Sequence, residues 1–436
     1  MQLLNIRFSA IDESNFIVNA RSSAGQAESR SSLPFYETKT KWRTTLIKIL
    51  EISKFSLDKF SDEEKIWMAQ EGFLLSDGSS FSADYLDKIG RSLYKSLFPV
   101  GKVSDLLQRS IALAEQDRNP QLHIQIEFNA EVTELNRLPD YPWEMVHDGQ
   151  NFLAHQNVTF SRYIAHLSAP STLSAVSPIN VLLISSGASD DENGLAPLSK
   201  KEHEAVKKGL EKSQEDGHIL FSEPGQASFK TLTTYLTENR GDDAPHVLHF
   251  DGHGVFGKRC LNSECRTFHG NLKLEKCKKC GTALSVPQGY LLFEPDDDDE
   301  LEANYVSAEE IGSLLQSIRH GDSESQQGGM RLAVLSACKS AYALGGNSVF
   351  NGVAQSLIGH GVPAVVAMQY TVSTKGATAF AERFYRELGN KQSLAVATSQ
   401  GRVAMQNVEH NQWYRLIFYL RWQANDGGQL FAAEDV

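Results

Sequence analysis

The chain has 436 residues, of which 41% are hydrophobic and 22% are charged, and its formal net charge is -12. This composition excludes a disordered or fibrous protein, and the length favours two compact domains. The negative charge argues against broad affinity for nucleic acids or anionic membranes, because both require a cationic surface. The chain start lacks the features of a signal peptide and no run of about 18 apolar residues occurs, so we expect a cytoplasmic protein that does not bind membranes.

The first part of the chain is expected to mix strands and helices. Apolar runs at residues 3–11 and 15–20 predict a strand pair, and the polar residues 21–32 predict a flexible loop. Apolar spacings of three and four residues predict helices between residues 41 and 115, and strict alternation at residues 122–128 predicts a half-buried strand. This part contains no enzyme motif, so we expect it to regulate the rest of the chain or to receive an activating partner.

From about residue 178, strands alternate with amphipathic helices, which is typical of an α/β domain built on a largely parallel sheet. We expect strands within residues 179–186, 246–250, 332–338 and 364–369. We expect helices within residues 202–213, 229–239 and 307–318. The last helix opens with a capping box formed by Ser307 and Glu310. We therefore predict a mixed N-terminal regulatory region, residues 1–170, and an α/β domain, residues 171–436.

Two predicted strands end in reactive side chains. The sequence HVLHFDGHG ends in a turn that carries His253, and the sequence LAVLSAC ends in Cys338. Reactive groups collect at the carboxyl ends of parallel strands, so we expect this imidazole and this thiol to meet. A thiol with a pKa near 8.5 needs a neighbouring base to become a nucleophile, and His253 supplies one. The N–H groups of Gly254 and Cys338 are expected to form an oxyanion hole.

Each of these residues also has a purely structural interpretation. A lone cysteine at a strand end is usually a small core residue, and a lone histidine is usually structural as well. The joint placement of His253 and Cys338 at strand ends favours the dyad. His246 and His249 are expected to pack on the strand or to support the site. Asp251 is compatible with orienting His253 or with being a solvated or structural carboxylate.

The residues around this pair resemble the CHAT family, bacterial members of the caspase and separase clan of cysteine peptidases. The resemblance rests on HFDGHG, LAVLSACKSA, SVFNGVAQSLIGHGVPAVVAMQYTVS, ATAFAERFYREL and, upstream, LPDYPWEMVHDGQNFLAHQNVTFSRY. It covers about residues 90–420. The resemblance implies a caspase-like fold, with His253 as the base, Cys338 as the nucleophile, and oxyanion donors at Gly254 and Cys338.

The resemblance also implies a cysteine endopeptidase acting on a specific protein substrate. Related bacterial proteases often serve in antiviral defence, where they cleave an effector such as a gasdermin-like pore former. Enzymes of the caspase clan select substrates by the residue before the cut. Asp190 and Asp191 are candidates for binding Lys or Arg there, although solvated loop carboxylates explain them equally well. Gln369, in the sequence VVAMQY, belongs to an alternative apolar pocket.

Four of the five cysteines lie between the presumed base and nucleophile. They follow the spacing C-x4-C, eleven residues, C-x2-C, at Cys260, Cys265, Cys277 and Cys280. Two such knuckles close a tetrahedral zinc site, which is structural because protein thiolates fill all four positions. Free thiols, disulfides, or His269 as a substitute ligand are the alternatives. We predict a zinc-ribbon-like insert at residues 258–284.

This insert is basic, with seven Lys or Arg and two Glu between Lys258 and Gly281. A solvated surface explains that charge, and docking of an acidic protein or a nucleic acid is the alternative. The competing function for the whole chain is a catalytically silent signalling scaffold whose zinc module binds nucleic acid or a protein partner. The intact pair of His253 and Cys338 speaks against it.

Overall fold

The chain forms two compact units, which comprise Met1–His166 and Leu167–Val436. The computed structural model describes residues 1–35, 41–52, 56–117, 120–129, 138–165, 176–198, 200–296, 303–320, 329–337, 349–422 and 424–431. The predicted nucleophile Cys338 lies outside these residues. No helix among the described residues has the length and apolar content needed to span a membrane.

A sheet with the strand order β5-β4-β1-β2-β3 forms the centre of the N-terminal unit. The strands are β1 (Gln2–Ala10), β2 (Asn15–Ser22), β3 (Gly25–Ser32), β4 (Leu122–Asn129) and β5 (Val158–Ala165). Strand β4 runs parallel to β1 and β5, whereas β2 is antiparallel to β1 and β3. The strand predicted at residues 122–128 is therefore confirmed as β4.

Residues 21–32 do not form the predicted flexible loop. They complete β2 and form β3, which pairs with β2 from Asn15↔Ser32 to Ser22↔Gly25. Strand β3 lies at the edge of the sheet, and its side chains are half-buried or exposed. An edge strand whose better-covered face is only half-buried needs no apolar residues, so its sequence resembles that of a loop.

Helices form within residues 41–115, as the apolar spacing predicts. They are α1 (Lys41–Glu51), α2 (Asp62–Gln70), α3 (Tyr85–Leu97) and α4 (Lys102–Ala114). The unit also has short 3-10 helices: η1 (Leu57–Lys59) between α1 and α2, and η3 (Leu138–Asp140), η4 (Trp143–Met145) and η5 (Leu153–His155) after β4. Helix α4 packs on the sheet, where its Ser110 Oγ lies 2.7 Å from Ser22 Oγ of β2. Fully buried Leu4, Ile6 and Val18 provide the apolar face of that sheet.

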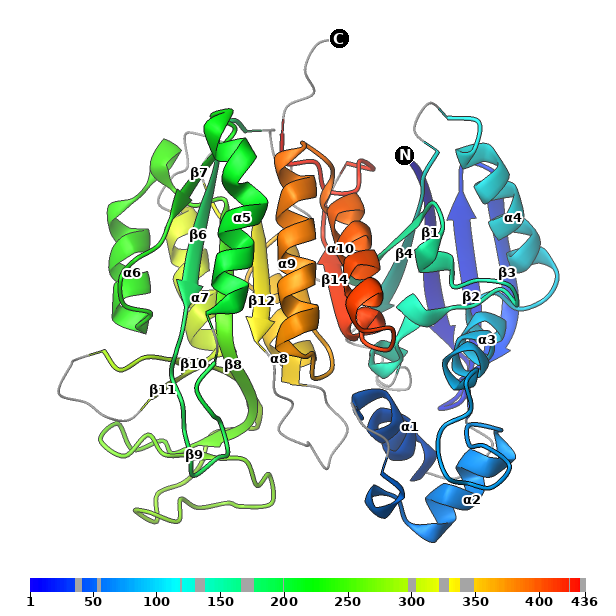
Figure 1. Ribbon diagram of the computed structural model, residues 1–436, viewed down its shortest axis with the longest axis horizontal. Coiled ribbons are helices and arrows are strands. Elements are labelled where there is room, and N and C mark those ends of the chain that lie inside the picture. The colour runs from blue at the N-terminus through cyan, green and yellow to red at the C-terminus, as the bar shows by residue number, and fades with distance from the viewer. Residues whose placement is uncertain are drawn as a thin grey trace. The chain divides into compact units, whose positions relative to one another are not determined.

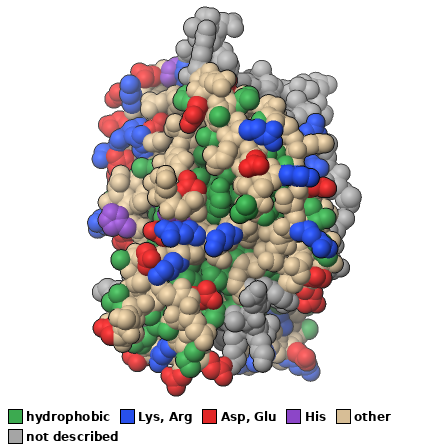
Figure 2. Space-filling model, turned by 90° about the vertical axis from the view of Figure 1, so that its right-hand side faces the viewer, with side chains coloured by type: hydrophobic (Ala, Val, Ile, Leu, Met, Phe, Trp, Pro, Cys, Tyr) green, Lys and Arg blue, Asp and Glu red, His purple; other side chains and the backbone are tan. Residues whose placement is uncertain are grey.

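The opposite face of the same sheet is polar. Alternate residues of β1, β2 and β3 line a cavity of about 740 Å³ there, among them Asn5, Arg7, Asn19, Arg21 and Glu28. Figure 2 looks at the side of the molecule where β3 and α4 lie, and Lys and Arg side chains gather at its mid-height among scattered Asp and Glu. One apolar and one polar face are typical of a sheet that is covered by helices on one side.

The C-terminal unit is built on a largely parallel sheet in the order β7-β6-β8-β12-β13-β14, in which β14 alone among these described strands is antiparallel to its neighbour. These strands are β6 (Ile179–Ser185), β7 (Ile219–Ser222), β8 (Val247–Arg259), β12 (Leu332–Ala337), β13 (Ala364–Met368) and β14 (Leu416–Leu420). Strands β9 (Phe268–His269) and β10 (Gln288–Phe293) pair with the second half of β8, and β11 (Asn304–Ser307) pairs with β10.

Helices flank this sheet, as Figure 1 shows for α5, α9 and α10 in front of the strands and α7 and α8 behind them. They are α5 (Lys201–Glu215), α6 (Phe229–Glu238), α7 (Ala308–His320), α8 (Val349–Gly359), α9 (Thr374–Gly389) and α10 (Leu394–Val408), with 3-10 helices η6 (Gly241–Asp243) and η7 (Trp413–Arg415). The capping box at α7 is present, because Glu310 N donates to Ser307 Oγ and Ser307 N donates to Glu310 Oε2. The predicted α/β fold with a largely parallel sheet is confirmed.

Strand β8 does not stop at DGHG, so the predicted turn at His253 is wrong. Its first half pairs in parallel with β6 and β12, and its second half pairs antiparallel with β10 from His253↔Leu292 onward. The glycines here permit close packing rather than a turn. A Cβ added at Gly252 would lie 2.6 Å from the Phe250 ring, and one at Gly257 would lie 2.5 Å from His269 O.

Candidate functional site

The sheet brings His253 and the end of β12 to the same place. Ala337, the last residue of β12, pairs in parallel with Gly252 of β8. His253 directly follows Gly252, and Cys338 directly follows Ala337 in the sequence. Cys338 lies outside the described residues, so its role as nucleophile and oxyanion donor stays a prediction.

His253 is held by a backbone carbonyl. Its side chain is buried, and its Nε2 lies 2.7 Å from the carbonyl oxygen of Ala196. Because a carbonyl oxygen only accepts hydrogen bonds, this contact assigns the proton to Nε2 and leaves Nδ1 as the basic nitrogen. Ala196 belongs to residues 187–198, which follow β6 and which we call the His-orienting loop. The sequence does not reveal this contact, because a backbone acceptor has no signature in the side chains.

Gly254, the other predicted oxyanion donor, is buried within β8 and lies opposite Leu291 of β10. The oxyanion role of Gly254 stays a prediction. His246, which directly precedes β8, accepts a hydrogen bond at Nδ1 from Asn180 N at 3.0 Å. This contact agrees with the packing role expected for His246.

A buried polar cluster lies beneath this part of the sheet. His249 Nδ1 is 2.8 Å from the Tyr385 hydroxyl of α9, and His249 Nε2 is 3.6 Å from Glu202 Oε1 of α5. The Asp251 carboxylate accepts a hydrogen bond from Ser185 Oγ at 3.2 Å. Asp251 is therefore hydrogen-bonded on the β6 side, while Ala196 holds the His253 ring.

Burial shifts the protonation of this cluster. It raises the pKa of Glu202 to about 7, and burial together with the neighbouring Glu202 raises the pKa of Asp251 to about 7. Burial lowers the pKa of His249 to about 4, although the nearby Asp251 acts in the opposite direction. At neutral pH the cluster therefore contains a neutral imidazole and two carboxyl groups that are close to their titration points.

Glu202→Gln is expected to change how stability depends on pH. A raised carboxyl pKa means that the folded state binds the proton more tightly than the unfolded state, so the free energy of unfolding falls as pH rises from about 4 to 7. Glutamine does not titrate, so the variant should match wild type near pH 4.5 and exceed it at pH 8, by up to about 3 kcal/mol. Urea unfolding followed by hydrogen exchange of β8 peptides between pH 4.5 and 8 measures this.

Glu204→Gln on the same helix is the matched control, because the Glu204 side chain is 73% exposed. Its stability should follow the wild-type dependence on pH. An unchanged pH dependence for Glu202→Gln would contradict the proposed titration of Glu202.

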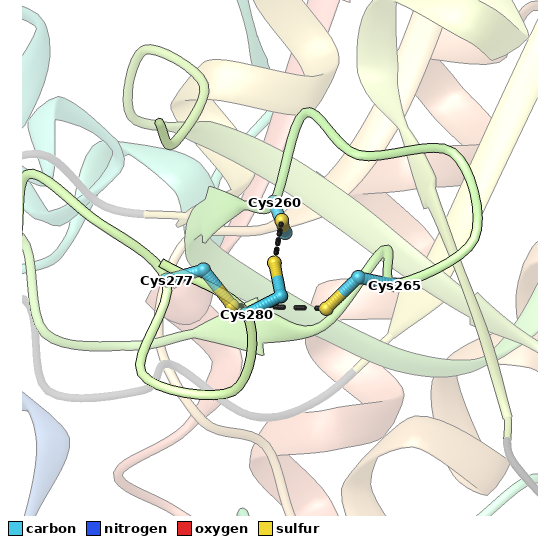
Figure 3. Close-up of side chains that lie close together, drawn as sticks. All are labelled: Cys260, Cys265, Cys277 and Cys280. Atoms are coloured by element: carbon cyan, nitrogen blue, oxygen red, sulfur yellow. Dashed lines mark hydrogen bonds between the residues drawn. The ribbon is translucent and has the colours of Figure 1, made fainter. Parts of the chain in front are cut away.

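The four insert cysteines converge, as Figure 3 shows. The Sγ atoms of Cys260 and Cys280 are 3.4 Å apart and those of Cys265 and Cys277 are 3.7 Å apart, with all four sulfurs within 4.8 Å of one another. A disulfide requires about 2.05 Å, whereas a tetrahedral site with metal–sulfur bonds of about 2.3 Å has sulfur–sulfur edges of about 3.8 Å. The cluster therefore fits a four-cysteine metal site.

The surroundings of the sulfurs also suit a metal. The N–H of Lys279 donates to Cys277 Sγ at 3.4 Å, as expected for a metal-binding knuckle. Hydrogen bonds with Thr267 and Thr282 lower the pKa of Cys265 and Cys280, which favours the thiolate form that binds metals, whereas burial raises the pKa of Cys260 to about 12. His269 Nε2 lies 3.3 Å from Cys277 Sγ, so His269 contacts a cysteine of the cluster. We call residues 258–284 the metal module.

The three predicted substrate-pocket residues differ in their surroundings. Asp190 accepts hydrogen bonds from the Tyr305 hydroxyl at 2.5 Å and from Asn193 Nδ2 at 2.8 Å. Burial opposes ionisation of Asp190, but these bonds outweigh it and lower its pKa. Asp191 is exposed. Gln369 is buried directly after β13, and its N–H donates to Arg415 O at 2.6 Å. Their substrate roles stay predictions.

The model of the CHAT domain matches residues 87–426. The chain belongs to the CHAT domain family. Membership of this family supports a cysteine peptidase in general. Among curated proteins, none matches this chain.

Several solved structures are similar to this CHAT chain at low sequence identity and low TM-score. Gingipain R, an Arg-specific cysteine proteinase, has 11% identity and a TM-score of 0.38, and the match covers 77% of this chain and 74% of that one. The complex of Porphyromonas gingivalis RgpB pro- and mature domains has 11% identity and a TM-score of 0.37, and the match covers 77% of this chain and 75% of that one. The Saccharomyces cerevisiae separase–securin complex has 13% identity and a TM-score of 0.42, and the match covers 96% of this chain and 30% of that one. These TM-scores all lie below 0.5, and nothing further is concluded from these likenesses.

Proposed function

We propose that this CHAT chain is a cysteine endopeptidase in which His253 is the general base and Cys338 is the nucleophile. The observation that carries the proposal is the pairing of Ala337 with Gly252. Neighbouring strands lie about 4.8 Å apart, so His253 lies beside the end of β12, the strand that directly precedes Cys338 in the sequence. The hydrogen bond from His253 Nε2 to Ala196 O supports it, because this bond leaves Nδ1 as the basic nitrogen.

In the proposed reaction, His253 takes the proton of the Cys338 thiol, and the thiolate attacks the carbonyl carbon of a peptide bond. The oxyanion that forms accepts hydrogen bonds from the N–H groups of Gly254 and Cys338. His253 then gives its proton to the departing amine, which leaves a thioester on Cys338. Water activated by the same imidazole hydrolyses this thioester, which releases the carboxylic acid and restores the thiol.

Labelling with a peptide acyloxymethyl ketone tests the proposal. The wild-type protein should take up about one equivalent, located by mass spectrometry on the peptide that contains Cys338, because an activated thiolate reacts faster than an ordinary thiol. Cys338→Ala should take up none. The competing scaffold function predicts equal, slow labelling of both proteins. Labelling that is unaffected by Cys338→Ala would reject the peptidase.

We propose that the metal of the module is zinc and that its role is structural. Four cysteine sulfurs without an open position are the ligand set of structural zinc sites, and binding would stabilise the folded module. Zinc therefore takes no part in the proposed hydrolysis. Metal analysis of the purified protein tests this, and a content well below one zinc per chain would contradict it.

The substrate is proposed to be a specific protein, such as a gasdermin-like pore former or another defence effector, cut in the cytoplasm. The family resemblance alone supports this. An activating protein or nucleic acid is proposed to bind the N-terminal unit or the metal module, whose Lys273, Lys276 and Lys278 are exposed. Co-expression of wild type and Cys338→Ala with neighbouring gene products tests the substrate, because fragments unique to wild type identify it. Identical fragments with both proteins would contradict it.

A further inference from the structure

A continuous set of contacts joins the metal module to the ring of His253. The first of them is the hydrogen bond from His253 Nε2 to Ala196 O in the His-orienting loop. That loop is closed on itself, because Asp190 and Leu195 exchange two backbone hydrogen bonds of 2.8 Å. Ala196 directly follows this closed turn, so anything that holds the turn also holds the acceptor of His253.

Tyr305 of β11 holds the turn. Its hydroxyl donates to Asp190 Oδ2 at 2.5 Å, and Asn193 Nδ2 donates to the same hydroxyl at 3.2 Å. Burial and the hydrogen bond to Asp190 raise the pKa of Tyr305 far above its ordinary value, so the phenol remains a donor at any physiological pH. The charged acceptor makes the Tyr305–Asp190 bond stronger than a bond between neutral groups.

The metal module holds Tyr305 in turn. The Tyr305 ring stacks on Phe268 of β9, with centroids 4.5 Å apart and planes 4° from parallel. Phe268 lies three residues after the metal-ligand candidate Cys265. The backbone oxygen of Tyr305 accepts a hydrogen bond from Arg259 Nη1, and Arg259 directly precedes Cys260. The ring and the backbone oxygen of Tyr305 are therefore both contacted by residues close to the cysteines.

Two further features make this connection rigid. Arg259 and Arg266 of the module both form ion pairs with Glu310 of α7, at 3.0 and 3.3 Å. Leu195, Phe268 and Tyr305 also belong to one buried apolar cluster that includes Val255, two residues after His253. The module has little regular structure of its own, namely the two-residue strand β9 and the isolated bridges Cys260↔Leu284 and Lys276↔Ala283, so we expect its order to depend on the cysteine cluster.

We propose that Tyr305 is a positioning residue through which the metal-bound state of the module fixes the Ala196 carbonyl against His253. When the metal is removed, Phe268 and Arg259 lose their fixed positions, Tyr305 no longer anchors Asp190, and the His253 ring loses its orienting acceptor. The effect of this connection on catalysis rests on the proposed function of His253 as the general base. The hydrogen bond itself exists whether or not the protein is a peptidase.

The test follows the Nε2 proton of His253 by nuclear magnetic resonance in protein with labelled histidine, assigned by comparison with His253→Gln. Tyr305→Phe removes the hydroxyl and keeps the stacked ring. The expected result is faster exchange of this proton with water, by about five- to ten-fold, since one hydrogen bond contributes about 1 kcal/mol net. Removing the metal from wild-type protein with a chelator should have the same effect.

Tyr290→Phe is the matched control. Tyr290 also packs against Phe268, but its hydroxyl lies 2.9 Å from Ser285 Oγ. In Tyr290→Phe, the Nε2 proton of His253 should exchange with water at the wild-type rate. Unchanged exchange in Tyr305→Phe would overturn the role of Tyr305, and unchanged exchange in the metal-free protein would overturn the coupling to the module.

Kinetics separate this inference from the proposed function. In an active peptidase, Tyr305→Phe should lower kcat by about five- to ten-fold, because the His253 ring loses its orienting acceptor. Faster exchange in a protein that cleaves no peptide would support the connection while rejecting the peptidase. A fall in kcat without a change in exchange would reject the connection while supporting the peptidase.

Discussion

His253→Ala is expected to lower kcat/KM for peptide hydrolysis by roughly 10²- to 10⁴-fold, the range that a positioned general base or acid supplies. Without the imidazole, no group takes the thiol proton or returns it to the departing amine. The residual rate should rise with pH through the ordinary thiol pKa of about 8.5 instead of levelling near neutrality. Hydrolysis of a fluorogenic peptide between pH 6 and 9.5 measures both effects.

Alkylation of Cys338 by iodoacetamide gives the same information without a known substrate, because only the thiolate reacts. The pH midpoint of alkylation should move upward in His253→Ala. His218→Ala is the control, since His218 is half-buried just before β7 and makes backbone contacts with Ser213 and Ile179. Identical alkylation midpoints in wild type and His253→Ala would show that His253 does not act as the base.

The parts of the fold that the sequence predicts correctly are those encoded by local pattern. The apolar runs in LAVLSAC and AVVAMQ end within one residue of β12 and β13, because a strand that is buried on both faces must be apolar throughout. The cysteine cluster was predictable for a similar reason. Each pair of ligands lies within a few residues of chain, so its spacing records the geometry of a metal knuckle.

The parts that the sequence does not predict depend on which segments become neighbours. Nothing local in HVLHFDGHG shows that β8 exchanges parallel for antiparallel partners at His253. The Ala196 carbonyl is a backbone group 57 residues from His253 in the sequence, and its neighbours give no sign of it. The polar sequence of β3 does not predict a strand, because β-propensity mainly reflects side chains packed on a half-buried sheet surface. An edge strand such as β3 buries few side chains.

Glu144→Gln is expected to destabilise the N-terminal unit by about 3 to 5 kcal/mol, since it removes the charge that compensates a buried cation. Arg162 Nη2 and Glu144 Oε2 are 2.7 Å apart, and both side chains are only 1% exposed. The guanidinium also donates to the carbonyl oxygens of Pro139 and Tyr141 at 2.6 and 2.9 Å. One arginine thus connects β5 to the segment around η3 and η4.

Glu127→Gln provides the contrast. Glu127 pairs with Arg7 at 2.6 Å in the same unit, but the Arg7 side chain is 64% exposed, so this loss should cost about 0 to 1 kcal/mol. Hydrogen exchange of β4 and β5 peptides measures the stability of the N-terminal unit separately, which matters because a chain of two units need not unfold in one step.

The double replacement Glu144→Leu with Arg162→Met should recover most of the stability lost in Glu144→Gln, since two apolar side chains leave no buried charge. Equal losses in the free energy of unfolding for Glu144→Gln and Glu127→Gln would mean that burial does not determine how much an ion pair stabilises this unit.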